Sequence, residues 1–283
     1  MRTINVKYVN HANQTFILQG DNLTYVDLEP LREYEWSYST AVRPNGMGGV
    51  ASSFQRPPRE IALEVRQRGF TRAQFLDQMN AFHAITEADK LAETPGKLYI
   101  EDEYLRCYLA VKGAVHAPRL GNFATRSVSV LAVDPYWCTE QTIVYNPASS
   151  VEDTTGKKYN NRYPYRYGTG SGNTTINNTH YAESPAIITI YGACSNPSVT
   201  IAGVVRNVNV TLLASERLVI DQVEHTIYTV NSSGTRTNIF NSRNKAYDIF
   251  SPIPAGESPL VYSGDYKLTV TLVQQRSEPK WTV

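Results

Sequence analysis

The chain has 283 residues, which exceeds one typical domain and favours two. Its 27 basic and 26 acidic residues give a formal net charge of +1, so neither nucleic acid nor an anionic membrane is expected as the main partner. Hydrophobic residues make up 41% of the chain, enough for a core, and 19 tyrosines stand against three tryptophans. Because tyrosine joins an apolar ring to a polar tip, this composition suits half-buried sheet faces and protein interfaces.

Targeting and redox signals are weak. The opening stretch MRTINVKYVNHANQTF has no apolar run of the signal-peptide kind, and no segment approaches the roughly 18 apolar residues of a membrane span. Cys107, Cys138 and Cys194 are odd in number and far apart. This spacing favours reduced thiols in a cytoplasmic protein over a disulfide framework or a zinc ribbon.

The first unusual segment is STAVRPNGMGGVASSFQRPPRE, residues 39–60, which is rich in Gly and Pro. Its composition predicts a long loop without regular structure, and such loops are either functional or mobile. Three apolar residues, Met47, Val50 and Phe54, interrupt it. We therefore expect an extended arm in which these three residues contact a neighbouring subunit.

A strand follows this arm directly. In REIALEVRQRG, Ile61, Leu63 and Val65 alternate with polar or small residues. This period of two predicts a strand with one buried face.

One helix is predicted, over GFTRAQFLDQMNAFHAITEADK. Thr71 and Gln74 have the spacing of a capping box, and Phe70 with Phe75 has that of a hydrophobic staple. Apolar residues recur at three- to four-residue spacing, which predicts that the helix packs on a sheet. The stripe consists of Phe75, Leu76, Met79 and Phe82.

The rest of the chain reads as short strands separated by turns. HTIYTVNSSGTRTNIF predicts a hairpin that closes on residues 231–234, and YKLTVTLVQQR predicts a strand with alternating faces. Many short strands of this kind favour a β-sandwich or barrel. Residues 149–178 are rich in Gly, Asn and Thr and predict a second long loop.

No catalytic, cofactor or metal site assembles in the sequence. The histidines at 11, 83, 116, 180 and 225 lack metal-site spacing, and there is no G-x-S-x-G elbow, P-loop or dinucleotide fingerprint. The acidic triplet 101–103 is explained by a hairpin turn. Cys138 has Glu140 nearby, and a carboxylate raises the pKa of a thiol, so we interpret Cys138 as structural.

Sugar binding stays open as an alternative. Four tyrosines in the second loop could stack on sugar rings, although Tyr-rich loops in β proteins mostly pack against protein. These residues are Tyr159, Tyr163, Tyr165 and Tyr167.

Three features taken together resemble the distal tail protein (Dit) family of long-tailed phages. They are a β domain with a single helix, FTRAQFLDQMNAFHAI, then the motif D-P-Y-W, and then a second β domain that opens with SPAIITIYGACSNPSVTIAG. The later segments ERLVIDQVEHTIYTVNSSGTRTN and PIPAGESPLVYSGDYKLTVTLVQQRSEPKW also follow the family's order. The resemblance covers nearly the whole chain.

The resemblance implies a mainly β protein with two domains. Residues 1–137 would be a ring-forming domain with β-sandwich or barrel character, one α-helix and an extended arm, and residues 138–283 a galectin-like β-sandwich. A homohexameric ring would join the tail tube protein to the tail hub, or tail-associated lysin, at the tail tip of a virion. Receptor-binding or baseplate proteins would attach outside. No galectin sugar-binding signature maps onto residues 180–283.

The motif D-P-Y-W is then interpreted as the interdomain joint. Asp134 is expected to cap a turn, and Pro135 ends the strand ladder because it lacks an N–H. Tyr136 and Trp137 are expected to wedge the two domains together. The sequence thus predicts a structural adaptor without catalysis, with a carbohydrate-binding β-sandwich protein of host recognition as the alternative.

Overall fold

The computed structural model describes residues 4–20, 23–116, 121–147 and 174–280, and the expected mainly β fold is confirmed. The chain forms two compact units, one of Met1–Thr139 with Gln275–Val283 and one of Glu140–Gln274. Two strands carry the chain out of the first unit and back into it, namely β10 (Trp137–Tyr145) and β21 (Leu268–Arg276). The last residues of the chain therefore group with the N-terminal unit.

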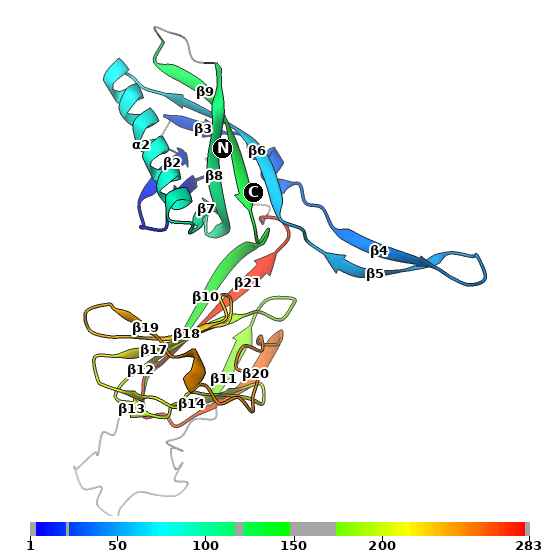
Figure 1. Cartoon of the computed structure of the whole chain (residues 1–283), viewed down its shortest axis with the longest axis vertical. Helices are drawn as coiled ribbons and strands as arrows, with labels where there is room; N and C mark the ends of the chain where they lie inside the picture. Colours follow the sequence, from blue (N-terminus) through cyan, green and yellow to red (C-terminus); the bar gives the residue numbers. More distant parts are fainter. Residues whose placement is uncertain (1–3, 21–22, 117–120, 148–173, 281–283) are drawn as a thin grey trace, which may run out of the picture. The chain divides into compact units, whose positions relative to one another are not determined.

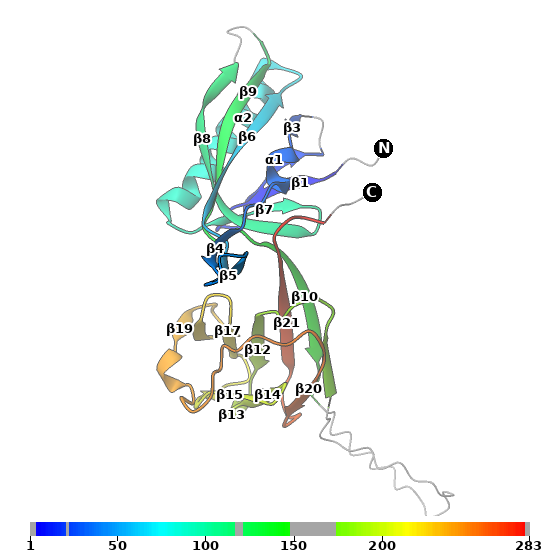
Figure 2. The ribbon, with the colours of Figure 1, turned by 90° about the vertical axis from the view of Figure 1, so that its right-hand side faces the viewer.

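The first unit is built on antiparallel strands in the order β2-β1-β7-β8-β9-β6-β3. Figure 2 shows β8, β9 and β6 side by side. The strands are β1 (Val6–Val9), β2 (Thr15–Gln19), β3 (Thr24–Val26), β6 (Arg59–Arg68), β7 (Gly96–Ile100), β8 (Glu103–His116) and β9 (Phe123–Ala132).

The alternation predicted for β6 is confirmed. Ile61, Leu63 and Val65 are 5%, 2% and 1% exposed and join Val128 and Val130 of β9 in one core cluster. All ten residues of β6 pair with β9 without a register shift. This long ladder is the most regular part of the first unit.

The predicted helix is α2 (Arg72–Leu91), which lies along the sheet (Figure 1). The Thr71 hydroxyl accepts a hydrogen bond from the Gln74 N–H at 3.2 Å, as predicted. The Gln74 side chain bonds the N–H of Phe70 at 2.9 Å, one residue earlier than a standard capping box. Phe70 is 76% exposed, so the predicted staple with Phe75 is wrong.

The apolar stripe of α2 is narrower than predicted. Phe75 and Phe82 are buried, and the ring of Phe82 lies 5.0 Å from that of Phe16 on β2. Leu76 is 44% exposed. The helix completes its buried face with the polar residues Thr86 and Asp89.

The second unit has two antiparallel sheets around one core. One contains the order β19-β18-β17-β12-β21, and the other is β11-β20-β14-β15. Ile188 and Leu268 from the first sheet share an apolar cluster with Ile201 and Leu260 from the second. This sandwich uses β11 (Thr174–Asn178), β12 (Ala186–Tyr191), β14 (Ser198–Ile201), β15 (Val204–Asn207), β17 (Arg217–Asp221), β18 (Thr226–Val230), β19 (Arg236–Asn238) and β20 (Gly256–Tyr262).

Smaller elements complete the chain: α1 (Glu29–Arg32), η1 (Phe240–Ser242) and the pair β13 (Cys194–Ser195) with β16 (Thr211–Leu212). The predicted hairpin at 231–234 is confirmed, because β18 pairs with β19 and the Asn231 N–H donates to the Thr235 carbonyl.

Of the predicted long loop 149–178, residues 149–173 lie outside the described part of the chain. These include Tyr159, Tyr163, Tyr165 and Tyr167. The last five residues of the loop are wrongly predicted, because they form β11. The galectin-like character of the second unit stays a prediction.

A buried polar cluster ties α2 to the sheet. Asp89 is fully buried, and its carboxylate accepts hydrogen bonds from the Tyr8 hydroxyl at 2.5 Å and the His11 N–H at 2.8 Å. The His11 ring Nδ1 lies 2.7 Å from the same carboxylate. Burial raises the pKa of Tyr8, so its hydroxyl stays a donor. Gly96 leaves room for this cluster, since a Cβ there would collide with Tyr8 and Asp89.

We predict that Asp89→Ala lowers the free energy of unfolding by about 3–5 kcal/mol, because the buried Tyr8 hydroxyl and the part-buried N–H of His11 lose a carboxylate acceptor. Urea denaturation measures the change. Glu87→Ala, a half-exposed carboxylate on the same helix, is the matched control and should change stability by less than about 0.5 kcal/mol. Equal effects of the two substitutions would show that the cluster contributes little.

Candidate functional site

The segment predicted as an irregular arm is in fact a β-hairpin. β4 (Ser37–Val42) pairs with β5 (Gly49–Gln55), so the prediction of a loop was wrong for most of its length. The turn is closed by a hydrogen bond from the Arg43 N–H to the Gly48 carbonyl at 3.1 Å. Gly46 and Gly48 have φ of 69° and 72°, values that glycine adopts without strain.

This hairpin has no buried face. Every residue of β4 and β5 is exposed, and Met47, Val50 and Phe54 are 77%, 54% and 60% exposed. Within the described part of the chain, the two strands pair only with each other (Figure 1). An isolated two-stranded hairpin is marginally stable in water at best, so a partner that covers its apolar side chains would stabilise it.

An aromatic and cationic cluster holds the base of the hairpin. The Arg56 guanidinium lies 4.1 Å from the ring centroid of Trp36 and 4.6 Å from that of Tyr136. The rings of Trp36 and Tyr38 approach Phe54 at 6.5 Å and 6.0 Å. A cation close to the faces of two aromatic rings is attracted to both, which helps to hold its side chain in place. Sequence reasoning missed Trp36 and Arg56, because only the fold brings them to Tyr136.

The motif 134–137 interrupts a ladder on β8. β9 ends at Ala132 and β10 begins at Trp137, and both strands pair with β8. Leu131 pairs with Tyr108, and Trp137 pairs with Leu105. Leu131 and Trp137 are six positions apart in the sequence (137 − 131), but their partners on β8 are only three positions apart (108 − 105). The segment between β9 and β10 therefore contains extra residues that do not pair with β8. The extra residues include Pro135, as expected of a residue without an N–H.

Within this interruption, the Tyr136 N–H donates to the main-chain carbonyl of Asp134 at 2.8 Å. Trp137 is 3% exposed and belongs to the core cluster of the first unit, while half-buried Tyr136 contacts Arg56. The role of Asp134, Pro135, Tyr136 and Trp137 as an interdomain wedge stays a prediction. Cys138 is 4% exposed, and its thiol lies 3.6 Å from the Tyr136 carbonyl as a weak donor.

Two of the three cysteines have thiols whose protonation is favoured by burial. Burial raises the pKa of the Cys107 and Cys194 thiols, which opposes thiolate formation. No group of three His, Cys, Asp or Glu side chains that could hold a metal occurs among these residues. In the same residues, no helix has the length and apolarity that crossing a membrane requires. The acidic triplet is the turn between β7 and β8, as predicted, with Glu103 already in the strand.

No protein-family model matches the sequence, and no curated protein matches it. Solved structures do match. The SPP1 Dit (gp 19.1) protein, described as a paradigm of the hub adsorption apparatus in Gram-positive infecting phages, is 12% identical with a TM-score of 0.59. The match covers 97% of this chain and 100% of that one. The fold is that of SPP1 Dit.

Chains of two phage baseplate structures also match over almost the whole of this chain. A chain of the phage P2 baseplate in its activated conformation with Ca is 11% identical, with a TM-score of 0.61. A chain of the phage p2 baseplate with Sr is 12% identical, with a TM-score of 0.62. Each match covers 99% of this chain and 100% of the other. The resemblance to Dit proteins expected from the sequence is confirmed for the fold.

We predict that Trp137→Ala lowers the free energy of unfolding by roughly 3–5 kcal/mol, because it leaves a cavity in the core of the first unit. Thermal and urea unfolding measure the loss. Cys138→Ser, the next residue along β10, is the control and should change stability much less, since a hydroxyl can donate to the same carbonyl. A loss of assembly in folded Cys138→Ser would instead point to a reactive role for the thiol.

Proposed function

We propose that this protein is a distal tail protein, a structural adaptor without catalysis that forms a homohexameric ring at the tail tip of a phage or phage-like particle. The observation that carries the proposal is the exposed β4–β5 hairpin on a chain whose fold matches the full length of SPP1 Dit. The ring would join the tail tube protein to the tail hub and carry baseplate or receptor-binding proteins.

The hairpin supports a ring for a physical reason. When the apolar side chains of one hairpin cover a surface of the next copy other than its hairpin, the contact is head to tail. Head-to-tail contacts generate closed rings when the rotation between copies closes. Covering Met47, Val50 and Phe54 would remove exposed apolar area from water and give the hairpin the packing that it lacks within its own unit.

The absence of catalysis is part of the proposal and rests on the chemistry of the described side chains. The His11 ring contacts buried Asp89, and His83 lies 3.5 Å from Glu87 in an exposed pair on one helix. The ring of His180 lies 4.1 Å from that of Tyr181 in a tilted arrangement, and that of His225 lies beside Phe250. These contacts are typical of packing and surface positions.

A carbohydrate-binding role is the second candidate, and one hollow of the second unit favours it. The hollow has a volume of about 340 Å³ and combines aromatic rings with charged groups. The Phe240 and Phe250 rings are stacked at 5.9 Å, Arg243 lies over Phe240 at 3.8 Å, and Tyr247 is 46% exposed. Aromatic faces beside polar groups suit sugar rings. Binding to a glycan array by a monomeric protein would favour this candidate.

We predict that the triple variant Met47→Ser, Val50→Ser, Phe54→Ser weakens assembly of the ring at least about tenfold in dissociation constant. Burial of each apolar side chain contributes about 1.5–3 kcal/mol, and 1.4 kcal/mol corresponds to a factor of ten. Light scattering coupled to size-exclusion chromatography gives the mass, and negative-stain microscopy shows whether six-fold rings form.

The matched control replaces three exposed leucines elsewhere, with Leu76→Ser, Leu91→Ser and Leu213→Ser. This variant should assemble like the wild type. A wild-type protein that stays monomeric at all concentrations, or a hairpin variant that forms unchanged rings, would refute the proposed arm.

A further inference from the structure

The segment between β19 and β20, residues 239–255, supplies most of the lining of the hollow of about 340 Å³ in the second unit. Its one helical piece is η1, and it contains no strand. Long connections without regular structure are either functional or disordered. This one is held in place, since the Asn209 N–H donates to the Ser242 carbonyl at 2.8 Å and the Asn244 N–H to the Asn207 carbonyl at 3.0 Å. A functional loop is therefore favoured.

Two buried polar side chains fix the part of this segment that follows η1. The Arg206 guanidinium donates to the Ser251 carbonyl at 2.7 Å, and the Gln222 amide donates to the Ile249 carbonyl at 3.3 Å. Burial lowers the pKa of Arg206 to about 10, and the charge of nearby Asp248 opposes this effect. The guanidinium is therefore still charged at neutral pH. Because burying a charge costs free energy, such an anchor is expected where the position of a loop matters.

Aromatic rings form the apolar part of the hollow. The Phe240 and Phe250 rings lie 5.9 Å apart and nearly parallel at 17°, and the His225 ring lies 5.1 Å from that of Phe250. Tyr247 also lines the hollow, is 46% exposed and contacts no other ring of the described residues. An exposed ring face of this kind suits the apolar face of a sugar.

The charged groups of the hollow are mainly cationic. Arg243 and Lys245 line it, and neither forms an ion pair with a described residue. The Arg243 guanidinium lies over Phe240 and donates to its carbonyl at 2.9 Å, which fixes the group and leaves other N–H donors for a ligand. Asp248 is the one carboxylate among the described lining residues, and one of its oxygens accepts a main-chain N–H at 3.2 Å. Buried Arg206 offsets its charge.

We propose that this hollow binds a saccharide that carries an oxyanion, either a carboxylate or a phosphate group. The oxyanion pairs with Lys245 and with Arg243, whose planar guanidinium suits a bidentate contact. The sugar ring packs on Tyr247, and a sugar hydroxyl donates to the other oxygen of Asp248. The volume lies at the small end of ligand pockets, so one end or a short stretch of the saccharide enters.

Other ligands fit this hollow less well. A neutral sugar would leave the two cations without an anion, and a small anion alone would leave Tyr247 unused. An acidic peptide is normally recognised along a sheet edge or an elongated groove, and this hollow is compact.

The inference rests on the second candidate function in one respect, namely that the second unit takes a sugar. It adds the charge class of that sugar and the residues that select it. It does not depend on the ring, because every lining residue belongs to the second unit.

The test presents the fluorescently labelled full chain to a glycan array in which each carboxylated or phosphorylated saccharide is paired with its neutral counterpart. We expect acidic saccharides to retain the protein at least about fivefold more than their counterparts, since hydrogen bonds between charged groups are the strong ones. The carboxylated and phosphorylated sets distinguish the two sources of the oxyanion. Isothermal titration calorimetry then gives the dissociation constant of the best saccharide, with acetate, inorganic phosphate and hexaglutamate as comparisons.

Variants separate a built site from general charge attraction. Lys245→Gln and Tyr247→Ala change exposed side chains and should each weaken the best saccharide at least about fivefold, through lost charge and lost stacking respectively. The matched controls are Arg217→Gln and Tyr181→Ala, which change exposed residues elsewhere in the same unit and should leave binding unchanged. Thermal unfolding of each variant checks that the second unit stays folded.

The inference is overturned if no acidic saccharide is retained above its neutral counterpart, or if hexaglutamate, acetate or phosphate binds as tightly as the saccharide. Equal losses in Lys245→Gln and Arg217→Gln would also overturn it. Retention of neutral saccharides alone would overturn the inference and leave the second candidate function standing.

The ring is measured separately by light scattering on the same protein. Rings that bind no acidic saccharide would overturn the inference and leave the proposed adaptor standing. Saccharide binding by a protein that never assembles would support the inference and overturn the adaptor.

Discussion

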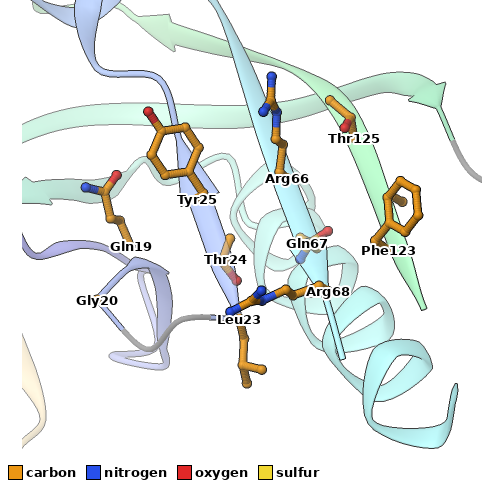
Figure 3. A pocket seen from close by; sticks show the side chains of 11 residues that line it. Gln19, Gly20, Leu23, Thr24, Tyr25, Arg66, Gln67, Arg68, Phe123 and Thr125 are labelled. Atoms are coloured by element: carbon orange, nitrogen blue, oxygen red, sulfur yellow. The ribbon is translucent and has the colours of Figure 1, made fainter. Parts of the chain in front are cut away.

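The long antiparallel ladder between β6 and β9 is the constraint on which two surfaces of the first unit depend. All ten residues of β6 are paired, so the strand holds a fixed register from Arg59 to Arg68. The exposed hairpin joins its first residue through Arg56 and two prolines, and a hollow of about 710 Å³ is lined by its last three residues (Figure 3). Because a paired strand cannot slip without turning its apolar face to water, the ladder fixes where the two surfaces lie within the first unit.

The elements predicted correctly from the sequence have one face buried and one exposed. β6, β21 and most of α2 are of this kind, since burial imposes a period on the sequence. The β4–β5 hairpin was missed because neither of its faces is buried, so no alternation marks it. The contacts of Arg56 with Trp36 and Tyr136 were also missed, since they join residues up to 100 positions apart (136 − 36).

Two buried polar side chains of the first unit show how differently such groups can be used. Asp89 is surrounded by donors from Tyr8 and His11, so its burial stabilises the packing of α2. Gln67 is equally buried, but its amide has no partner among the described residues. A buried polar side chain that stabilises the packing of the fold has its partners within the chain, as Asp89 does. The sequence marks neither role, because both residues occupy positions that an apolar residue would suit.

The hairpin differs from the rest of the first unit in the partner that it suits. It has exposed apolar side chains, one cation at Arg43 and no carboxylate, so it suits an apolar surface. A ring held together by such contacts would leave other surfaces of the unit for the components that an adaptor joins.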